Sequence, residues 1–281
     1  MQLDQTRIAI RERSFGDLLD LALRVLRTHA PALCVTWMLG AVPAAALNIW
    51  LLGDSVTYQL ESGLTEDQVV EALFGSGFQL ALLLIMEVPW VAMLTTLYLG
   101  QAMFVERPSP RQLAADAVRS LPQMFLFQLV IRALLLPWII TWLVLYGSWP
   151  FLNEIILLER NPVRKSSRHP ALTSTFNRNQ VLHSRSTGEL FGRWIFSLVL
   201  GGALMGSIWL TLWRGWAILW DTNTTDWTTF VVFPQIAIWT VLGYFTIVRF
   251  LSYLDLRIRN EGWEIELKMR AEAARLARQV A

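Results

Sequence analysis

Residues 121–158 have the sequence LPQMFLFQLVIRALLLPWIITWLVLYGSWPFLNEIILL, in which only Arg132 and Glu154 carry a charge. A helix that crosses a bilayer needs about 17–25 residues, so this stretch is long for one crossing and just long enough for two. The number of crossings here decides which side of the membrane every later segment faces.

The composition of the whole chain indicates an integral membrane protein. The hydrophobic fraction is 54%, the charged fraction is 16% and the mean hydropathy is +0.41. Apolar residues occur in long blocks rather than in amphipathic stripes, and the 14 tryptophans are of a type that gathers where a bilayer meets water. We therefore expect an all-α, polytopic helical bundle whose transmembrane domain covers 31–254. Its six expected spans are 31–52, 77–104, 121–137, 142–158, 194–219 and 230–254.

Sidedness follows from the distribution of lysine and arginine. Of the 24 basic residues, all but Arg132, Arg214 and Arg249 lie in the N-terminal region, in 105–120, in 159–193 or in the tail. The positive-inside rule places these four segments in the cytoplasm together with both termini. Because two of the segments flank 121–158, the chain must enter and return within it. The alternative is one span followed by a re-entrant piece.

Two cytoplasmic regions are expected to flank the transmembrane domain. In the first, residues 1–30, Ser14 has the pattern of an N-cap with Asp17 as its capping-box partner, and residues 15–27 form an amphipathic helix expected at the membrane interface. An ordinary soluble amphipathic helix is the alternative. The second, the charged tail 255–281, continues as a helix from about Gly262.

Polar residues at membrane depth are the first place to seek function, because burying them there is costly unless they are paired. Glu87 and Arg132 are both expected well inside the membrane at similar depth, where they are able to form an ion pair. Asn48 and Gln128 are the other polar candidates. With so few polar groups in the spans, a contact that pins two helices is a better interpretation than a transport site.

Small residues predict close helix packing in two spans. Gly40 and Ala44 form one small-xxx-small pattern, and Gly202 and Gly206 form another. Packing inside one bundle is the simpler interpretation, and a homo-oligomer is the alternative.

The chain lacks the sequence patterns of the common enzymes. Its three histidines are scattered and Cys34 is its only cysteine, so no zinc ligand set is expected, and no cofactor is assigned. There is no Walker loop, no G-x-G-x-x-G and no G-x-S-x-G. Proximity to anionic lipid explains the basic loop 159–193, and no nucleic-acid partner is expected. The basic residues noted in this loop are Arg160, Arg164, Lys165, Arg168, Arg178 and Arg185.

Three stretches carry a resemblance to a family. They are RSFGDLLDLALRVLR at 13–27, ERNP at 159–162 followed by GELFGRW at 188–194, and YLDLRIRNEG at 253–262. Together they resemble bacterial six-span membrane proteins related to the membrane domain of glycerophosphodiester phosphodiesterases. The catalytic barrel of those enzymes is absent, so the resemblance implies a fold and a bacterial cytoplasmic membrane but no activity. The motif residues noted in the last stretch are Asp255, Arg257, Arg259, Glu261 and Gly262.

These observations favour a protein that is not an enzyme. The expected function is that of an accessory or assembly subunit of a membrane complex, with the lipid bilayer as its setting and with loop 159–193 and tail 255–281 as contact surfaces for other proteins. The alternative is a transporter of a small molecule or lipid that uses Glu87 and Arg132.

Overall fold

The structure is a computed structural model that describes residues 14–61, 66–103, 105, 108–135, 150–159, 161–163, 174–183, 186–220 and 227–261. All the elements assigned within these residues are helical. Five helical stretches are long and apolar enough to cross a membrane. They are Phe15–Asp54, Gly75–Ala102, Pro110–Leu135, Thr187–Trp220 and Thr228–Asn260. The described residues thus form an all-helical structure with helices able to span a membrane, as the composition predicted.

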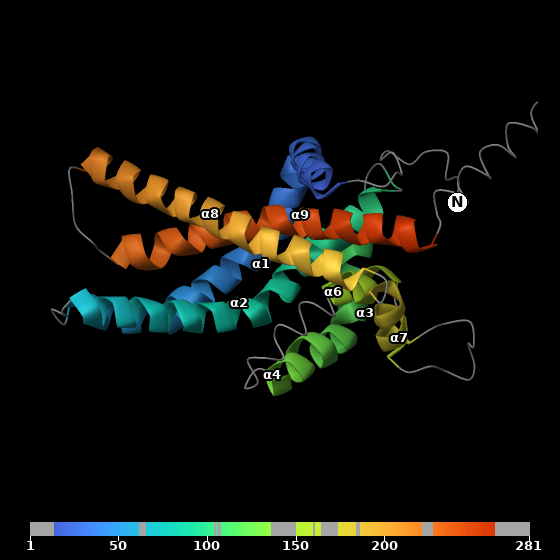
Figure 1. Cartoon of the computed structure of the whole chain (residues 1–281), viewed down its shortest axis with the longest axis horizontal. Coiled ribbons are helices and arrows are strands. Elements are labelled where there is room, and N and C mark those ends of the chain that lie inside the picture. Colours follow the sequence, from blue (N-terminus) through green and yellow to red (C-terminus); the bar gives the residue numbers. More distant parts are fainter. Residues whose placement is uncertain are drawn as a thin grey trace, which may run out of the picture.

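Helix α9 (Phe233–Glu261) holds the bundle together. It packs against α1 (Phe15–Glu61), α2 (Glu66–Ala102) and α8 (Thr187–Trp220), and these helices run lengthwise in Figure 1. Short elements lie to one side of these long helices, toward the end of the bundle where α8 begins and α9 ends. These elements are α3 (Pro110–Met124), η2 (Phe125–Ile131), α4 (Arg132–Leu135), α6 (Leu152–Glu154), η3 (Ile155–Glu159) and α7 (Thr175–His183), while η4 (Thr228–Val232) precedes α9.

Helix α1 changes direction at His29, where the backbone leaves helical geometry (φ −112°, ψ 19°). Pro31 explains the kink, because its ring removes an N–H donor and clashes with the carbonyl four residues earlier. Figure 1 shows the first turns of α1 nearly end-on and the rest running lengthwise. The predicted capping box is confirmed: Ser14 N donates to Asp17 Oδ2, and Asp17 N donates to Ser14 Oγ, both at 3.2 Å.

The first turns of α1 pack against the bundle. Leu18 and Ala22 are buried with Ile247 and Phe250 of α9, and the Tyr244 hydroxyl donates to the Leu19 carbonyl at 3.0 Å. The apolar face that the spacing predicted for residues 15–27 thus packs against α9.

A small residue lets α1 and α2 approach closely at mid-length. A Cβ atom added to Gly40 would lie only 2.8 Å from the Val91 Cα. Ala41 and Ala44 on the same stretch are buried against α2 and α9 with Trp37, Ala92 and Trp239. The first small-xxx-small pattern therefore serves packing within the bundle, as interpreted from the sequence.

Several boundaries differ from those expected. The helix that contains Arg132 begins at Pro110, inside what was expected to be a loop, because Pro110 has a favourable position in the first turn. The region 159–193 contains α7 and the start of α8, and α9 continues through Asp255, Arg257 and Arg259 to Glu261. Of the expected span 142–158, only residues from 150 onward are described, and Gly262 with the tail beyond it lies outside the described residues.

Candidate functional site

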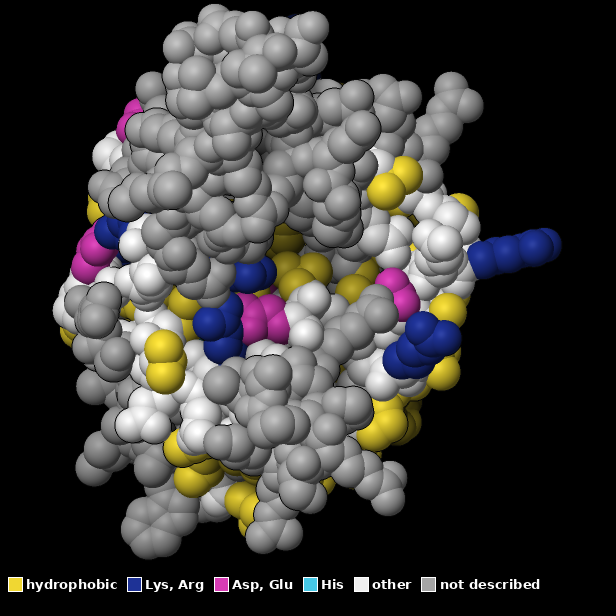
Figure 2. Space-filling view, turned by 90° about the vertical axis from the view of Figure 1, so that its right-hand side faces the viewer, with side chains coloured by type: hydrophobic (Ala, Val, Ile, Leu, Met, Phe, Trp, Pro, Cys, Tyr) yellow, Lys and Arg dark blue, Asp and Glu magenta, His cyan; other side chains and the backbone are white. Residues whose placement is uncertain are grey.

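Ionic side chains from five elements meet at the end of the bundle where α8 begins and α9 ends. We call this group the charged cluster. It contains Glu154, Glu159, Arg178, Glu189, Arg193, Arg249, Asp255, Arg257 and Arg259. Figure 2 shows basic and acidic side chains side by side near the middle of this end. Six of its members, Glu159, Glu189, Arg193, Asp255, Arg257 and Arg259, come from the stretches that carry the family resemblance.

Glu159 joins three elements within the cluster. Arg178 of α7 binds its carboxylate through two nitrogens, Nε at 2.6 Å and Nη2 at 2.9 Å. The Tyr253 hydroxyl of α9 donates to the same carboxylate at 2.7 Å, and Arg257 lies 3.6 Å away. Burial favours a raised pKa for Glu159, but the hydrogen bonds from Arg178 and Tyr253 and the two arginine charges outweigh it and hold the pKa below its usual range.

The helices α8 and α9 are joined by a second set of ion pairs. Arg193 Nη2 contacts Glu189 at 2.6 Å and Asp255 of α9 at 3.2 Å. Arg259 of α9 contacts the same two acids, Asp255 at 3.0 Å and Glu189 of α8 at 2.9 Å. These four residues form a closed ring of alternating charge, in which each residue contacts two of opposite sign and removal of one leaves the other three with one charge in excess.

Arg249 and Glu154 connect α9 to α6. Their side chains meet at 2.6 Å, and the Glu154 side chain has no exposed surface. A carboxylate buried to this degree requires a cation, and Arg249 supplies it. Glu154 was one of only two charges in the stretch that decides the fold, and its partner lies almost one hundred residues later in the chain.

His183 lies beneath the cluster at the end of α7. Its ring stacks on Phe151 with centroids 5.6 Å apart, and its Nδ1 lies 2.6 Å from the Asn179 carbonyl oxygen. Burial lowers the pKa of His183, although the bond to the Asn179 carbonyl opposes this. Burial thus favours the neutral form of this side chain.

Glu87, within the long apolar helix α2, is bound by the amide of Asn48. Asn48 Nδ2 donates to Glu87 Oε2 at 2.9 Å and to Gln235 Oε1 at 3.3 Å. Trp239 Nε1 donates to the same Gln235 oxygen at 3.1 Å. Two oxygens of this group, Glu87 Oε1 and Asn48 Oδ1, are buried and accept no hydrogen bond from the described residues. The structure does not form the ion pair of Glu87 with Arg132 that the sequence made possible: Glu87 Oε2 bonds Asn48, and Oε1 has no partner among the described residues.

Arg132 has a different role, which Pro89 explains. Its Nη1 donates to the Ile85 carbonyl at 2.7 Å. In a regular helix that carbonyl would accept from the N–H of residue 89, but proline has none. Asn153 Nδ2 donates to the Pro89 carbonyl at 3.3 Å in the same region. Ile85 and Glu87 lie about 200° apart around the helix axis, so Arg132 reaches α2 from the side away from Glu87.

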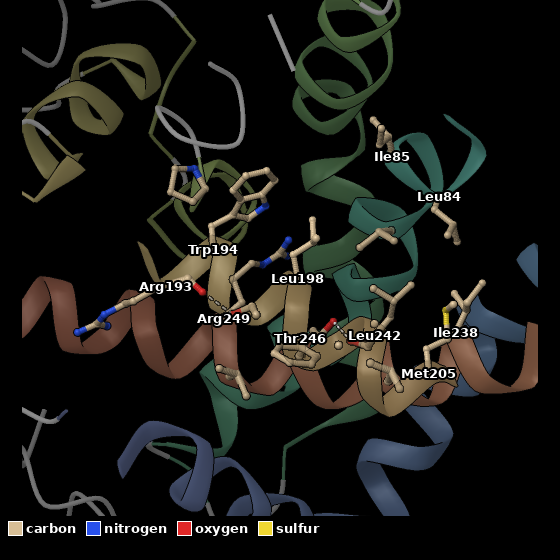
Figure 3. A pocket seen from close by; sticks show the side chains of 18 of the residues that line it. Leu84, Ile85, Arg193, Trp194, Leu198, Met205, Ile238, Leu242, Thr246 and Arg249 are labelled. Carbon is tan, nitrogen blue, oxygen red and sulfur yellow. Dashed lines mark hydrogen bonds between the residues drawn. The ribbon is translucent and has the colours of Figure 1, made fainter. Parts of the chain in front are cut away.

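A largely apolar groove of about 570 Å³ lies between α2, α8 and α9. Figure 3 shows side chains of all three helices around it. The labelled residues are Leu84 and Ile85 of α2, Arg193, Trp194, Leu198 and Met205 of α8, and Ile238, Leu242, Thr246 and Arg249 of α9. The groove therefore extends from the charged cluster toward the middle of the bundle.

Several expected site residues lie apart from these groups. Gln128 is fully buried in η2, and neither of its side-chain polar atoms has a hydrogen-bond partner among the described residues. Of the basic loop only Arg178 is described; Arg160, Arg164, Lys165, Arg168 and Arg185 lie outside the described residues, as does Gly262.

Sequence reasoning missed Gln235, which lies five residues from the start of the expected span 230–254. It also left Arg249 without a role, since nothing near it in sequence marks Glu154 as its partner.

Comparison with known proteins found no match to this chain among family models, curated proteins or solved structures. The described residues also contain no group of three or more histidine, cysteine, aspartate or glutamate side chains able to hold a metal ion. The chemistry present in these residues is ion pairing, amide hydrogen bonding and apolar contact.

Proposed function

We propose that the chain is an accessory or assembly subunit of a membrane complex, and that it binds a partner's transmembrane helix on the outer face of α8. The proposal rests on one observation about α8. In its apolar stretch none of the residues is buried within the chain, and of the whole helix only Leu190 and Arg193 are buried. The other long helices bury between a fifth and more than half of the corresponding stretch.

The exposed face of α8 carries a regular stripe of small and branched residues. Val199, Ala203, Gly206 and Leu210 follow one another at spacings of four, three and four, which places them along one line of a helix. Val199, Ala203 and Leu210 are exposed, and a Cβ atom added to Gly206 would meet nothing within 4 Å. Small residues of this kind let two transmembrane helices approach closely, and packing contacts of this kind hold such helices together in lipid.

Affinity purification from native membranes tests this proposal. The wild-type chain should retain a stoichiometric protein partner, either a different subunit or a second copy, and Gly206→Leu should lose it. Gly215→Leu is the matched control, because residue 215 is also open and lies about 180° around the helix from residue 206. Equal retention by both variants, or no protein partner with the wild type, would contradict the proposal.

The proposed topology has six spans with both termini in the cytoplasm. It is supported by the loop charges and by the five helices that are able to span. Single cysteines introduced into a Cys34→Ser background test it with an impermeant thiol reagent. Positions Ser62 and Thr225 should react in intact cells, and Gln180, which is exposed on α7, should react only after permeabilisation. Reaction at 180 from outside would exclude the two crossings within 121–158.

A second candidate, transport of a small molecule or ion, is favoured by the group of Asn48, Glu87 and Gln235. Here a carboxylate lies at membrane depth among amides, with two buried oxygens that accept no bond from the described residues. Ionisable residues in such places often lie on substrate or proton paths. A small molecule that co-purifies with the wild type but not with Glu87→Gln would favour this candidate over the first.

A further inference from the structure

The groove between α2, α8 and α9 has the size and lining of a ligand site. Sites for small molecules are commonly about 300–1,000 Å³, mostly apolar, with a few polar groups in fixed positions. The 570 Å³ groove fits this description, because leucine, isoleucine, valine, methionine and phenylalanine make up most of its lining. Its polar side chains include Arg193, Ser197, Arg249 and Ser252, which come from the end nearest the charged cluster.

The polar end of the groove favours an anion. Among the described residues, the charged cluster contains five arginines and four carboxylates. Arg193 Nη1 and Arg249 Nη2 are buried and donate no hydrogen bond to the described residues, and the Arg193 side chain is only 9% exposed. Figure 3 shows Arg249 extending from α9 toward Trp194 and Leu198, while the Arg193 side chain points away from Arg249. A buried donor without an acceptor is unfavourable, so an anionic oxygen would stabilise this end.

The length of the apolar part matches one leaflet of a bilayer. The lining as a whole begins at Ser252 on α9 and at Leu190 on α8. Beyond this polar end, its apolar part extends on α9 from Arg249 to Ile238 and on α8 from Trp194 to Met205. Each is eleven residues, or about 16–17 Å at a rise of about 1.5 Å per residue. Half of a hydrocarbon core of about 30 Å is about 15 Å. An acyl chain whose headgroup lies at the level of Arg249 would therefore follow the groove to the middle of the membrane.

We propose that this groove binds an anionic phospholipid, with its phosphate at Arg249 and one acyl chain between α2 and α8. Basic pockets between transmembrane helices are known to take such headgroups, and Trp194 belongs to a residue type that gathers at this depth. The proposal requires the membrane setting but is independent of the docking stripe on α8, because the stripe and the groove lie on different sides of that helix.

The test compares phosphatidylglycerol with phosphatidylcholine, each added to the detergent-purified protein and followed by native mass spectrometry and thermal unfolding. Phosphatidylglycerol should remain bound to the wild type and raise its Tm more than phosphatidylcholine does. Gly202→Phe should weaken phosphatidylglycerol binding at least tenfold, because residue 202 lines the groove and has open space for a side chain that fills it. Gly215→Phe, which is equally open but outside the groove, should bind as the wild type does.

A second variant tests the headgroup without leaving a buried charge. The pair Arg249→Gln and Glu154→Gln removes both members of one ion pair, and it should abolish the preference for phosphatidylglycerol over phosphatidylcholine. If this variant does not fold, the Gly202→Phe comparison still decides the question. Equal Tm shifts with the two lipids in the wild type, or unchanged phosphatidylglycerol binding by Gly202→Phe, would overturn the proposal. The proposal would also be overturned if Gly202→Phe removed a bound polypeptide from the purified complex while lipid binding stayed unchanged.

Discussion

If Arg132 supplies the donor that Pro89 lacks, the two residues must be energetically coupled. In the wild type, Arg132 Nη1 donates to the Ile85 carbonyl at 2.7 Å. Replacing Arg132 with Gln removes a hydrogen bond from a charged donor, which contributes about 1.5–3 kcal/mol, and leaves that carbonyl without its partner. We therefore expect Arg132→Gln to destabilise the protein by about 2–3 kcal/mol in the wild-type background.

The background Pro89→Ala changes this result. Alanine restores a backbone N–H at position 89, and that group is able to donate to the Ile85 carbonyl within a regular helix. Arg132→Gln should then cost about 1–2 kcal/mol less than it does beside proline. Some cost remains, because Arg132 has contacts besides the bond to Ile85.

A double-mutant cycle measures this coupling directly. The four proteins are purified in the same detergent, and their unfolding free energies are obtained from reversible denaturant titrations. Independent sites add to within about 0.3–0.5 kcal/mol, so a coupling of at least 1 kcal/mol supports the proline interpretation. A coupling below about 0.5 kcal/mol would refute it. Glu87→Gln serves as the control, because Glu87 faces away from Arg132 and should show no coupling with it.

Three further predictions concern the charged cluster and the core. Glu159→Gln should destabilise the purified protein by about 3 kcal/mol, because Arg178 loses its carboxylate; denaturant titration measures this, and a change under 1 kcal/mol would contradict it. For His183, whose folded pKa is lowered, the unfolded chain binds the proton more readily, so Tm should fall as pH drops below about 6.5. His183→Gln should remove that part of the pH profile, and an unchanged profile would count against it. Gly40→Leu should greatly reduce the folded yield, since its Cβ would meet the Val91 backbone at 2.8 Å, and a normal yield would disprove the close approach.

The helical class and most of the long helices were predictable from the sequence, because blocks of apolar residues have few alternatives to a membrane-crossing helix. The capping box at Ser14 was predictable too, since it depends on residues three apart. The start of the third helix at Pro110 was not, because its first turns are polar and the expected span was drawn from hydropathy alone. Charged residues near a span do not end a helix when, like Arg111 and Arg119, they lie on its exposed face.

The charged cluster shows what sequence alone leaves open. The short motifs that contain Glu159, Glu189, Arg193 and Asp255 lie far apart in the sequence, and only a family resemblance connects them there. The structure brings them together because α8 begins and α9 ends at the same end of the bundle. Ion pairing between residues far apart in sequence depends on helix order and rotation, which hydropathy does not determine.

The roles of Arg132 and Glu87 now separate, and this bears on the second candidate function. Arg132 satisfies a backbone carbonyl that a proline leaves free, so its presence at depth has a structural cause. Glu87 does not satisfy a free backbone group in this way, and Asn48 donates to Gln235 independently of Glu87. If the protein transports anything, flux should therefore depend on Glu87 and tolerate the loss of Arg132 once Pro89 is alanine. Flux that survives Glu87→Gln in a folded protein would leave the amide group with a purely structural role.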